Sequence, residues 1–383
     1  MTALPRAQFP VAEHYTYFDH AGVAPITKAA ADAVRWWALH FEQNGRANYD
    51  ELEHRMHRAR QSAATLLGVP TDDVAFVKNT TEGLGFVASG LQWKPGDRVV
   101  VPDREFPSTI YPWLSLRDLG VQVDLVAPIG DGGALPTEAF EDAIADGPPP
   151  KVVATSWVNY GRGWRVDLAA LASVCHEAGA LLCADVMQGV GVIPADLATW
   201  DVDFAVVGAH KWLCSPRGLG VLYVAPRVRD QLRPLEPGWA SVAHRGEWDN
   251  LDLVWDDSAR RFEGGSPNVA GTVGLGASID VLLEAGIARV WQHVDALCAR
   301  LTERLNALPG VRVLSDRSGE GRSAVMTFVS DAMSADQLAE RLEAKRFLCA
   351  PRGGGIRVSP HGYNDEAEVD AFVDAVSAAL AAR

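Results

Sequence analysis

Residues 181–224, LLCADVMQGVGVIPADLATWDVDFAVVGAHKWLCSPRGLGVLYV, contain three apolar segments that are separated by polar and glycine-rich turns. We expect these segments to be buried strands at 181–185, 203–208 and 219–224. Asp185 ends the first strand, and His210 and Lys211 follow the second. Ligands of open α/β sheets bind at the carboxyl ends of strands, so the side chains of Asp185 and Lys211 could converge on one bound molecule.

Lysine is scarce in this chain, and we expect Lys211 alone to follow a buried strand. A partly desolvated amine beside His210 has a lowered pKa, which favours the neutral nucleophile that forms a Schiff base. Pyridoxal 5'-phosphate (PLP) requires such a lysine, and also a carboxylate that keeps its pyridine nitrogen protonated, a role that suits Asp185. A buried ion pair, or a lysine that extends from a strand end toward solvent, explains the pair equally well. The lysines are Lys28, Lys78, Lys94, Lys151, Lys211 and Lys345.

The runs DVMQGVGVIPAD, DVDFAVVGAHKW and PRGLGVLYV within this stretch resemble the fold-type-I PLP enzymes called class V aminotransferases. This family includes cysteine desulfurases, selenocysteine lyases, kynureninases and isopenicillin-N-epimerase-like proteins. The resemblance extends from YFDHAGVAPI at 17–26 to IRVSPHGYND at 356–365. It implies an α/β fold, the PLP-dependent transferase fold type I, with a mostly parallel sheet flanked by helices. We expect a large cofactor-binding domain over 21–270 and a smaller α+β domain formed by the N-terminal arm, 1–20, and 271–383.

The composition is that of a globular protein, because 48% of the 383 residues are hydrophobic and 22% are charged. A formal net charge of −14 argues against nucleic acid or an anionic membrane as the main partner. The cysteines are few and widely spaced without a CxxC pair, which indicates reduced thiols in a cytoplasmic protein. No signal sequence or membrane span is expected. Glu53, His54 and His57 lack a further ligand at a fitting spacing, so we expect no metal site.

The segment 74–91 is expected to form a strand, a turn and a helix capped by Thr80 and Thr81. The free N–H groups of that helix could bind an anion. An ordinary helix cap is the alternative, but the resemblance implies that the threonine pair binds the PLP phosphate together with His210. It also implies that the turn at Gly264–Ser266 donates Ser266 to the phosphate of the neighbouring subunit, in a homodimer with shared sites; a flexible domain linker is the other interpretation.

Other polar and aromatic residues are expected around the cofactor ring. Phe106 stands where desulfurases carry a histidine that stacks on the ring, and an aromatic face can hold the pyridine by offset stacking, although it could also be plain core. Gln188, one turn beyond Asp185, is the candidate partner of the cofactor's phenolic oxygen. Asn159 or Tyr160 could reach the same oxygen, and these polar groups could instead satisfy a loop.

The segment FLCAPRGGGIRVSPHGYND, residues 347–365, limits the chemistry. Arg357 matches the family arginine that binds the substrate α-carboxylate, a task for a planar bidentate donor, so an amino acid is the expected substrate. Arg352 could contact the cofactor region or a second acidic group, or it could be a surface charge. Desulfurases insert a loop with a persulfide-forming cysteine between these arginines, whereas only residues 353–356 separate them here. Cys349 precedes Arg352, so its match to that cysteine is interpreted as coincidence.

The resemblance implies an external aldimine and an α-carbanion, with Lys211 as the base. Reprotonation or loss of a β-substituent then gives transamination, epimerisation or β-elimination. We expect transamination or C–S lyase-like β-elimination, with epimerase and kynureninase-like reactions as alternatives and cysteine desulfuration disfavoured by the missing loop. A non-catalytic PLP-binding scaffold is the competing class. The sequence leaves the substrate and pathway open.

Overall fold

The computed structural model describes residues 2–47, 49–130 and 132–381. Its centre is a seven-stranded sheet in which β8 runs antiparallel to both neighbours and the other strands are parallel to one another. The mostly parallel α/β sheet predicted from the sequence is therefore confirmed. In sheet order the strands are β2 (Val74–Val77), β8 (Gly220–Val224), β7 (Phe204–Gly208), β6 (Leu181–Asp185), β5 (Val152–Ser156), β3 (Arg98–Pro102) and β4 (Gln122–Val126).

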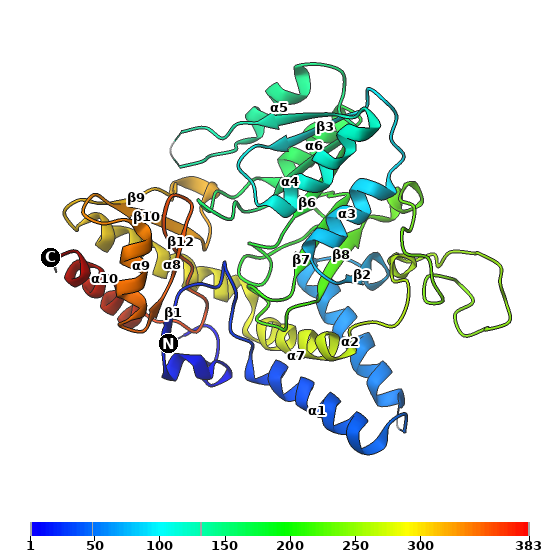
Figure 1. Cartoon of the computed structure of the whole chain (residues 1–383), viewed down its shortest axis with the longest axis horizontal. Helices are drawn as coiled ribbons and strands as arrows, with labels where there is room; N and C mark the ends of the chain where they lie inside the picture. The colour runs from blue at the N-terminus through cyan, green and yellow to red at the C-terminus, as the bar shows by residue number, and fades with distance from the viewer. Residues whose placement is uncertain (1, 48, 131, 382–383) are drawn as a thin grey trace.

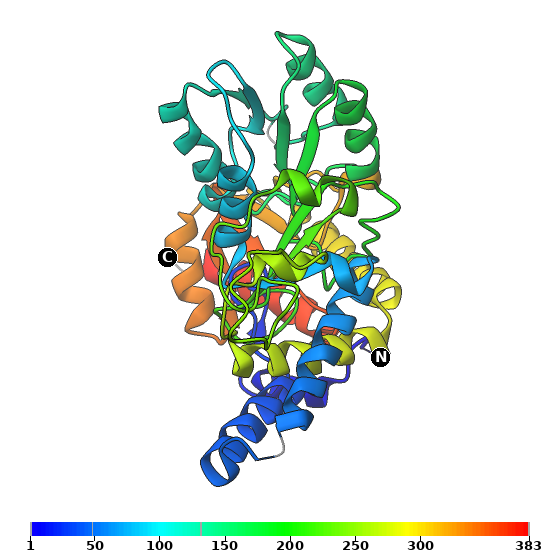
Figure 2. The ribbon, with the colours of Figure 1, turned by 90° about the vertical axis from the view of Figure 1, so that its right-hand side faces the viewer.

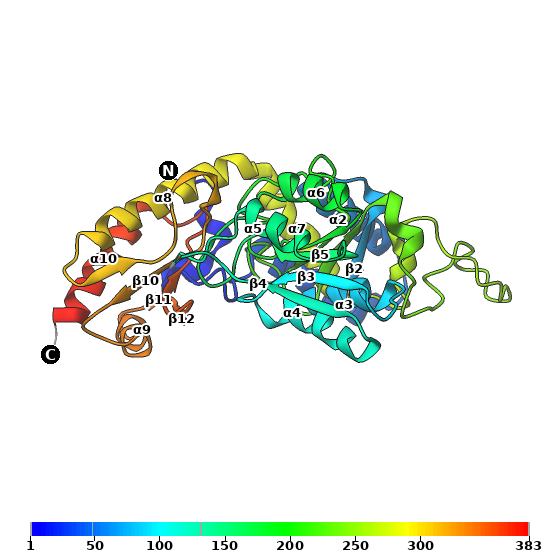
Figure 3. The same ribbon diagram turned by 90° about the horizontal axis from the view of Figure 1, so that it is seen from above.

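Helices cover both faces of this sheet, so its inner strands are apolar along their whole length rather than alternating. Every residue of β3, β5, β7 and β8 is buried. Figure 3 shows α5 and α6 on one side of the sheet and α3 and α4 on the other. The helices of this part are α1 (Lys28–Asn44), α2 (Tyr49–Leu67), α3 (Thr80–Gly90), α4 (Pro107–Leu114), α5 (Thr137–Ala145), α6 (Leu168–Glu177) and α7 (Val269–Ala285).

A second, smaller unit lies beside the large sheet (Figure 1). Its antiparallel sheet has the order β12 (Ala350–Arg352), β13 (Gly355–Val358), β10 (Met326–Ser330) and β9 (Val311–Val313). The helices α8 (Ile287–Asn306), α9 (Ala335–Glu343) and α10 (Glu366–Ala381) pack with it around a separate hydrophobic cluster. This arrangement agrees with the α+β fold expected for the C-terminal part.

The N-terminal arm contacts both units, because Leu4 and Phe9 belong to the large hydrophobic cluster while its last residues pack onto the smaller unit. β1 (Thr16–Tyr17) pairs in parallel with β11 (Phe347–Leu348), and Phe18 belongs to the smaller hydrophobic cluster. α7 begins near the expected boundary, but Leu275 and Ile279 of this helix pack into the large cluster. The division into 21–270 and 1–20 with 271–383 therefore stays a proposal, supported by two separate sheets and by the pairing of β1 with β11.

The N-cap of α3 differs from the prediction. Asn79, rather than Thr80 or Thr81, caps this helix, because its side chain accepts a hydrogen bond from the backbone N–H of Glu82. The two threonines occupy the first helical positions instead. Asparagine is among the most favourable N-cap residues, which explains why the helix begins one residue earlier than a threonine cap would place it. The threonine hydroxyls are therefore not consumed by capping.

Two segments extend away from the rest of the molecule. The chain between η5 (Pro226–Gln231) and η6 (Ala259–Phe262) projects beyond the large sheet in Figures 1 and 3, and it exposes Trp248 and Leu251. Figure 2 shows α1 reaching away from the sheet. Other short 3-10 helices are η1 (Arg6–Gln8), η2 (Pro10–Glu13), η3 (Thr71–Asp73), η4 (Ser115–Leu119) and η7 (Gly319–Gly321).

Within the described residues, none of the helices combines the length and apolar character needed to cross a membrane. No cluster of potential metal ligands was found in the same part of the chain, including the helix that carries Glu53, His54 and His57.

Candidate active site

A cavity of about 470 Å³ opens at the carboxyl ends of the central strands, between the large sheet and the smaller unit. It contains most of the residues that the sequence singled out, together with others that it did not. The lining residues are Asp19, Ala21, Gly22, Val23, Asn79, Thr80, Thr81, Phe106, Ser108, Ser156, Tyr160, Asp185, Met187, Gln188, His210, Lys211, Ala350, Arg352 and Arg357. The predicted convergence of the β6 and β7 strand ends on one space is thus observed.

Lys211 lies three residues after the end of β7 and lines this cavity, and burial lowers its pKa from 10.5 to about 8. The charge of Arg357 lowers this pKa further, while Asp185 and Asp19 oppose the effect. Among the described residues, no carboxylate lies within ion-pair distance of the Lys211 ammonium, whose nitrogen lies 5.4 Å from the centre of the Phe106 ring. The pair with Asp185 is therefore not a closed salt bridge, and the amine is available to react.

Asp185 ends β6, which runs parallel to β7. One carboxylate oxygen accepts the backbone N–H of Met187 at 2.9 Å, and the other accepts the hydroxyl of Thr109 at 3.0 Å. Burial raises the pKa of Asp185, whereas these hydrogen bonds and the Lys211 charge lower it. A positively charged group in the cavity would relieve the cost of burying this carboxylate.

Hydroxyl and N–H groups gather at the start of α3. Thr80 and Thr81 line the cavity there, and the Thr81 hydroxyl lies 2.7 Å from that of Ser108 at the start of α4. First-turn N–H groups of a helix attract anions. His210 lies at the same cavity, and burial together with the charges of Lys211 and Arg217 lowers its pKa to about 4, so its imidazole is neutral.

Gly208, the last residue of β7, leaves little room for a side chain. A Cβ atom at position 208 would lie 2.9 Å from Cε of Met187 and 3.2 Å from the Thr80 hydroxyl. Met187 thus fills the space that a serine would need.

Two aromatic side chains form walls of the cavity. The rings of Phe106 and Tyr160 meet edge to face, with centroids 5.5 Å apart. Phe106 is 44% exposed, so it is not the plain core residue that one interpretation allowed. Its exposed ring can accept a stacked planar ligand.

Asn159 and Tyr160, the two candidates for contact with the cofactor's phenolic oxygen, have different surroundings. Asn159 accepts hydrogen bonds from the backbone N–H groups of Gly161 and Arg162 and donates to the carbonyl of Arg104, so it satisfies a loop. Tyr160 lines the cavity, as does Gln188. The Gln188 amide donates to the carbonyl of Ala21 and accepts the indole N–H of Trp212, which fixes its orientation and leaves one N–H for a ligand.

Arg357 lies on β13 at the cavity and is almost fully buried. It donates to the carbonyl of Tyr160 at 3.0 Å and to the carboxylate of Asp19 at 2.9 Å. Gly22 makes room for this carboxylate, because a Cβ atom at position 22 would lie 2.3 Å from an Asp19 oxygen. Arg352, on the neighbouring strand β12, also lines the cavity, is exposed, and donates to the carbonyl of Pro351.

Several cavity residues were missed by sequence reasoning. Asp19 lies in the YFDHAG turn, which the sequence did single out as part of an arm near the site, so that turn was the available signal. Ser108, Thr109 and Ser156 follow no motif and were found only by their position. Ser266 is exposed and does not line this cavity of its own chain.

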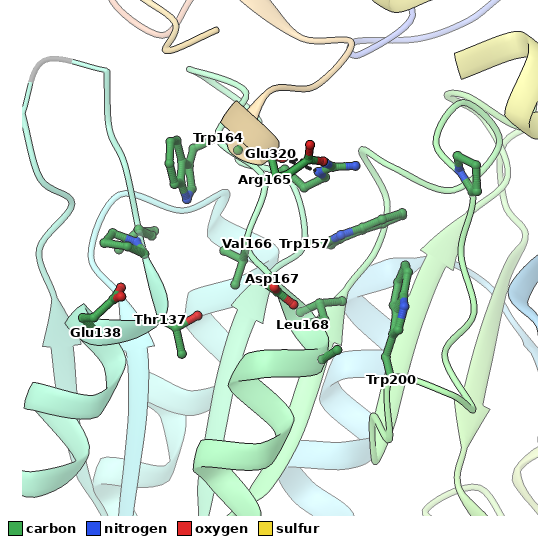
Figure 4. A pocket seen from close by; sticks show the side chains of 15 residues that line it. Thr137, Glu138, Trp157, Trp164, Arg165, Val166, Asp167, Leu168, Trp200 and Glu320 are labelled. Carbon is green, nitrogen blue, oxygen red and sulfur yellow. Dashed lines mark hydrogen bonds and ion pairs between the residues drawn. The ribbon is translucent and has the colours of Figure 1, made fainter. Parts of the chain in front are cut away.

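A second hollow of about 400 Å³ lies beside α6 (Figure 4). The rings of Trp157 and Trp200 are 5.1 Å apart on one side of it. Three of its four charged groups are already engaged, since Arg165 pairs with Glu320 at 3.0 Å and Asp167 caps α6. No lysine lines this hollow in the described structure, so it offers no nucleophilic amine.

The first cavity fits PLP in three respects. An unpaired amine with a lowered pKa is present for an aldehyde, a buried carboxylate is present for a protonated ring nitrogen, and helix N–H groups with adjacent hydroxyls are present for a phosphate.

Comparisons with known proteins agree with this geometry. Residues 16–372 match the model of the family described as aminotransferase class V. A probable cysteine desulfurase of Methanothermobacter thermautotrophicus is 29% identical, over 95% of this chain and 94% of that protein. An uncharacterized aminotransferase of Bacillus subtilis is 28% identical, over 97% of this chain and 96% of that protein.

A solved structure shows the same fold over the same extent. The apo cysteine desulfurase of Thermococcus onnurineus superposes with a TM-score of 0.88 at 25% identity and covers 98% of both chains. The predicted fold type I is confirmed, as are the PLP cofactor and the enzymatic nature of the protein. The family match spans the lysine, the carboxylate and the arginine of the cavity, and the chain therefore belongs to the PLP-dependent class V aminotransferase family.

Proposed function

We propose that this enzyme acts on an amino acid by transamination or by C–S lyase-like β-elimination. The observation that carries the proposal is the convergence of Lys211, Asp185 and Arg357 on one cavity. PLP, when bound, supplies an aldehyde that captures the amino group and an electron-withdrawing ring that stabilises negative charge at Cα. The protein residues supply binding, orientation and proton transfer.

Lys211 is the proposed base. With a pKa near 8, about a tenth of its amines are neutral at pH 7, whereas an ordinary lysine has far fewer neutral amines. A neutral amine in a desolvated site accepts the substrate α-proton at Nζ. Asp185 holds a proton at the ring nitrogen, and its hydrogen bonds to Met187 and Thr109 keep its carboxylate in place.

Binding roles follow from position. Thr80, Thr81 and His210 hold the phosphate, with Ser108 beside them, while Phe106 stacks on the ring. Gln188 and Tyr160 flank the ring's oxygen substituent. Arg357 would bind the substrate carboxylate, and Arg352, which lines the same cavity, would bind a second acidic group of the substrate.

A homodimer with shared sites is part of the proposal. Ser266 is exposed outside its own cavity, and the nearby segment 239–254 exposes several large apolar side chains. Exposed apolar surface of this kind is typical of a surface that a partner covers. Ser266 would then complete the phosphate site of the partner subunit. Light scattering of the purified protein, and of a Leu251→Asp variant, tests this arrangement.

Cysteine desulfuration is a second candidate because similar proteins carry that name. The structure gives two observations against a persulfide relay. β12 and β13 are joined by Gly353 and Gly354 alone, which leaves no loop to carry a thiol to the substrate. No cysteine lines the cavity in the described structure, and burial raises the pKa of the Cys349 thiol to about 12. A C–S lyase-like elimination needs no such thiol.

Two measurements test the proposal. Borohydride reduction followed by mass spectrometry is expected to show a cofactor adduct on Lys211 and none on a Lys211→Met variant. Incubation with a panel of amino acids, followed by analysis for keto acid, sulfide, alanine and D-isomer, identifies the reaction. Absence of the adduct refutes the function as a whole. D-isomer as the sole product, or alanine with persulfide, refutes the reaction type.

A further inference from the structure

A second buried carboxyl group lies behind Asp185. Glu105 is 6% exposed and precedes α4. Its Oε2 atom lies 2.7 Å from the hydroxyl of Ser156, which is 3.5 Å from the hydroxyl of Thr109. The Thr109 hydroxyl donates to Asp185 at 3.0 Å. Four side chains from three separate segments thus form a continuous chain of polar contacts that ends on Asp185.

The number of available hydrogens determines the direction of the hydrogen bonds between these four side chains. Each hydroxyl carries one hydrogen. If Glu105 is ionised, Ser156 donates to Glu105 and Thr109 donates to Asp185, so no hydrogen remains for the contact between the two hydroxyls. If Glu105 is protonated, it donates to Ser156, Ser156 donates to Thr109, and Thr109 donates to Asp185. Only when Glu105 is protonated are all three contacts hydrogen bonds, each donated in the direction of Asp185.

The surroundings of Glu105 favour the protonated form. Its Oε1 atom is buried without a hydrogen-bond partner among the described residues, and an unpaired oxygen costs less on a neutral acid than on a carboxylate. Burial raises the pKa of Glu105 from 4.5 to about 7, and the charge of Asp185 raises it as well, although hydrogen bonds from Ser156 and from the backbone of Phe106 oppose these effects. Arg104, its neighbour in the sequence, pairs with Asp103 at 3.7 Å.

We propose that Glu105 is a positioning residue whose protonated form, through Ser156 and Thr109, stabilises Asp185 as an ionised carboxylate. This inference rests on the proposed function, because Asp185 matters as the partner of the cofactor's ring nitrogen. Hydrogen bonds donated toward Asp185 hold the shared proton on the ring nitrogen rather than on the carboxylate. Deprotonation of Glu105 reverses the Ser156 hydroxyl and adds a negative charge behind Asp185, so the ring environment changes with pH.

The first experiment uses the cofactor-free protein. Infrared difference spectroscopy during a pH titration is expected to show a buried carboxylic acid that loses its proton with a midpoint near 7. The Glu105→Gln variant is expected to lack this signal, because the amide is neutral at every pH and still donates to Ser156. Glu138→Gln makes the same chemical change in the hollow of Figure 4 and is expected to keep the signal.

The second experiment uses the PLP-loaded protein and follows its visible absorbance against pH. Wild type and Glu138→Gln are expected to share an absorbance transition near pH 7. Glu105→Gln is expected to lack this transition, and Ser156→Ala, which interrupts the series of hydrogen bonds, is expected to reduce it strongly. A residue that only supports the fold would change stability without moving this transition.

The inference is overturned if the acid signal is absent from wild type, if it survives in Glu105→Gln, or if the absorbance transition is the same in all four proteins. These failures differ from failure of the proposed function. A missing borohydride adduct on Lys211 refutes that function even when the cofactor-free protein shows the Glu105 titration.

Discussion

Replacement of Lys211 by methionine is expected to stabilise the cofactor-free protein, and only below a defined pH. The pKa of Lys211 is lowered from 10.5 to about 8 in the folded protein, chiefly by desolvation. This difference corresponds to about 3 kcal/mol of lost folding free energy when the amine is protonated in both states. Methionine fills a similar volume without a charge, so Lys211→Met recovers up to about 3 kcal/mol at pH 7.

The sign of the pH dependence follows from the direction of the shift. The folded state binds fewer protons than the unfolded state between pH 8 and 10.5, so wild-type stability rises with pH across that window. The stability difference between Lys211→Met and wild type is therefore full below about pH 8 and disappears toward pH 10.5.

Urea unfolding at a series of pH values measures this difference. Lys94→Met is the matched control, because Lys94 is exposed and its loss is expected to change stability by less than about 0.5 kcal/mol at every pH. A constant difference between Lys211→Met and wild type from pH 7 to 10.5 would refute the desolvation argument, as would a variant that is less stable than wild type at pH 7.

Three further variants test other parts of the site. Arg357→Lys keeps the charge but loses the planar fork, so KM for the substrate should rise at least about tenfold while the PLP spectrum is retained, as steady-state kinetics would show. Gly208→Ser should cost about 1–3 kcal/mol in thermal unfolding, because its side chain meets Met187, and Met187→Ala should restore most of the loss. Asn79→Ala removes the cap of α3 and should cost about 1 kcal/mol while weakening PLP binding in a fluorescence titration.

The central strands and the convergence of Asp185 and Lys211 were predictable because both depend on local patterns. Short apolar runs between glycine-rich turns identify β6, β7 and β8, and parallel strands place their carboxyl ends at one edge. The family resemblance added Thr80, Gln188 and Arg357, which line the same cavity.

The chain of hydroxyls behind Asp185 was not predictable in this way. Ser156 lies on another segment than Glu105 and Thr109, and each residue type is common in buried or capping positions without special chemistry. Their meaning comes from distances across the fold. The capping error at α3 has another cause, since Asn79 and Thr80 are both good caps and the sequence does not decide which of two adjacent residues begins the helix.

The pairing of Asp19 with Arg357 bears on how a substrate carboxylate is recognised. The guanidinium already donates to Asp19 and to the carbonyl of Tyr160, and its Nε atom is buried without an acceptor among the described residues. Asp19 offsets part of the positive charge, so a carboxylate gains less from simple attraction than it would from an isolated arginine. It gains instead from donors that are held in one orientation, since Asp19 and Tyr160 fix the plane of the guanidinium before the substrate arrives. The arm that carries Asp19 is therefore part of substrate recognition in the proposed function, because without it the charge of Arg357 would remain but its orientation would not.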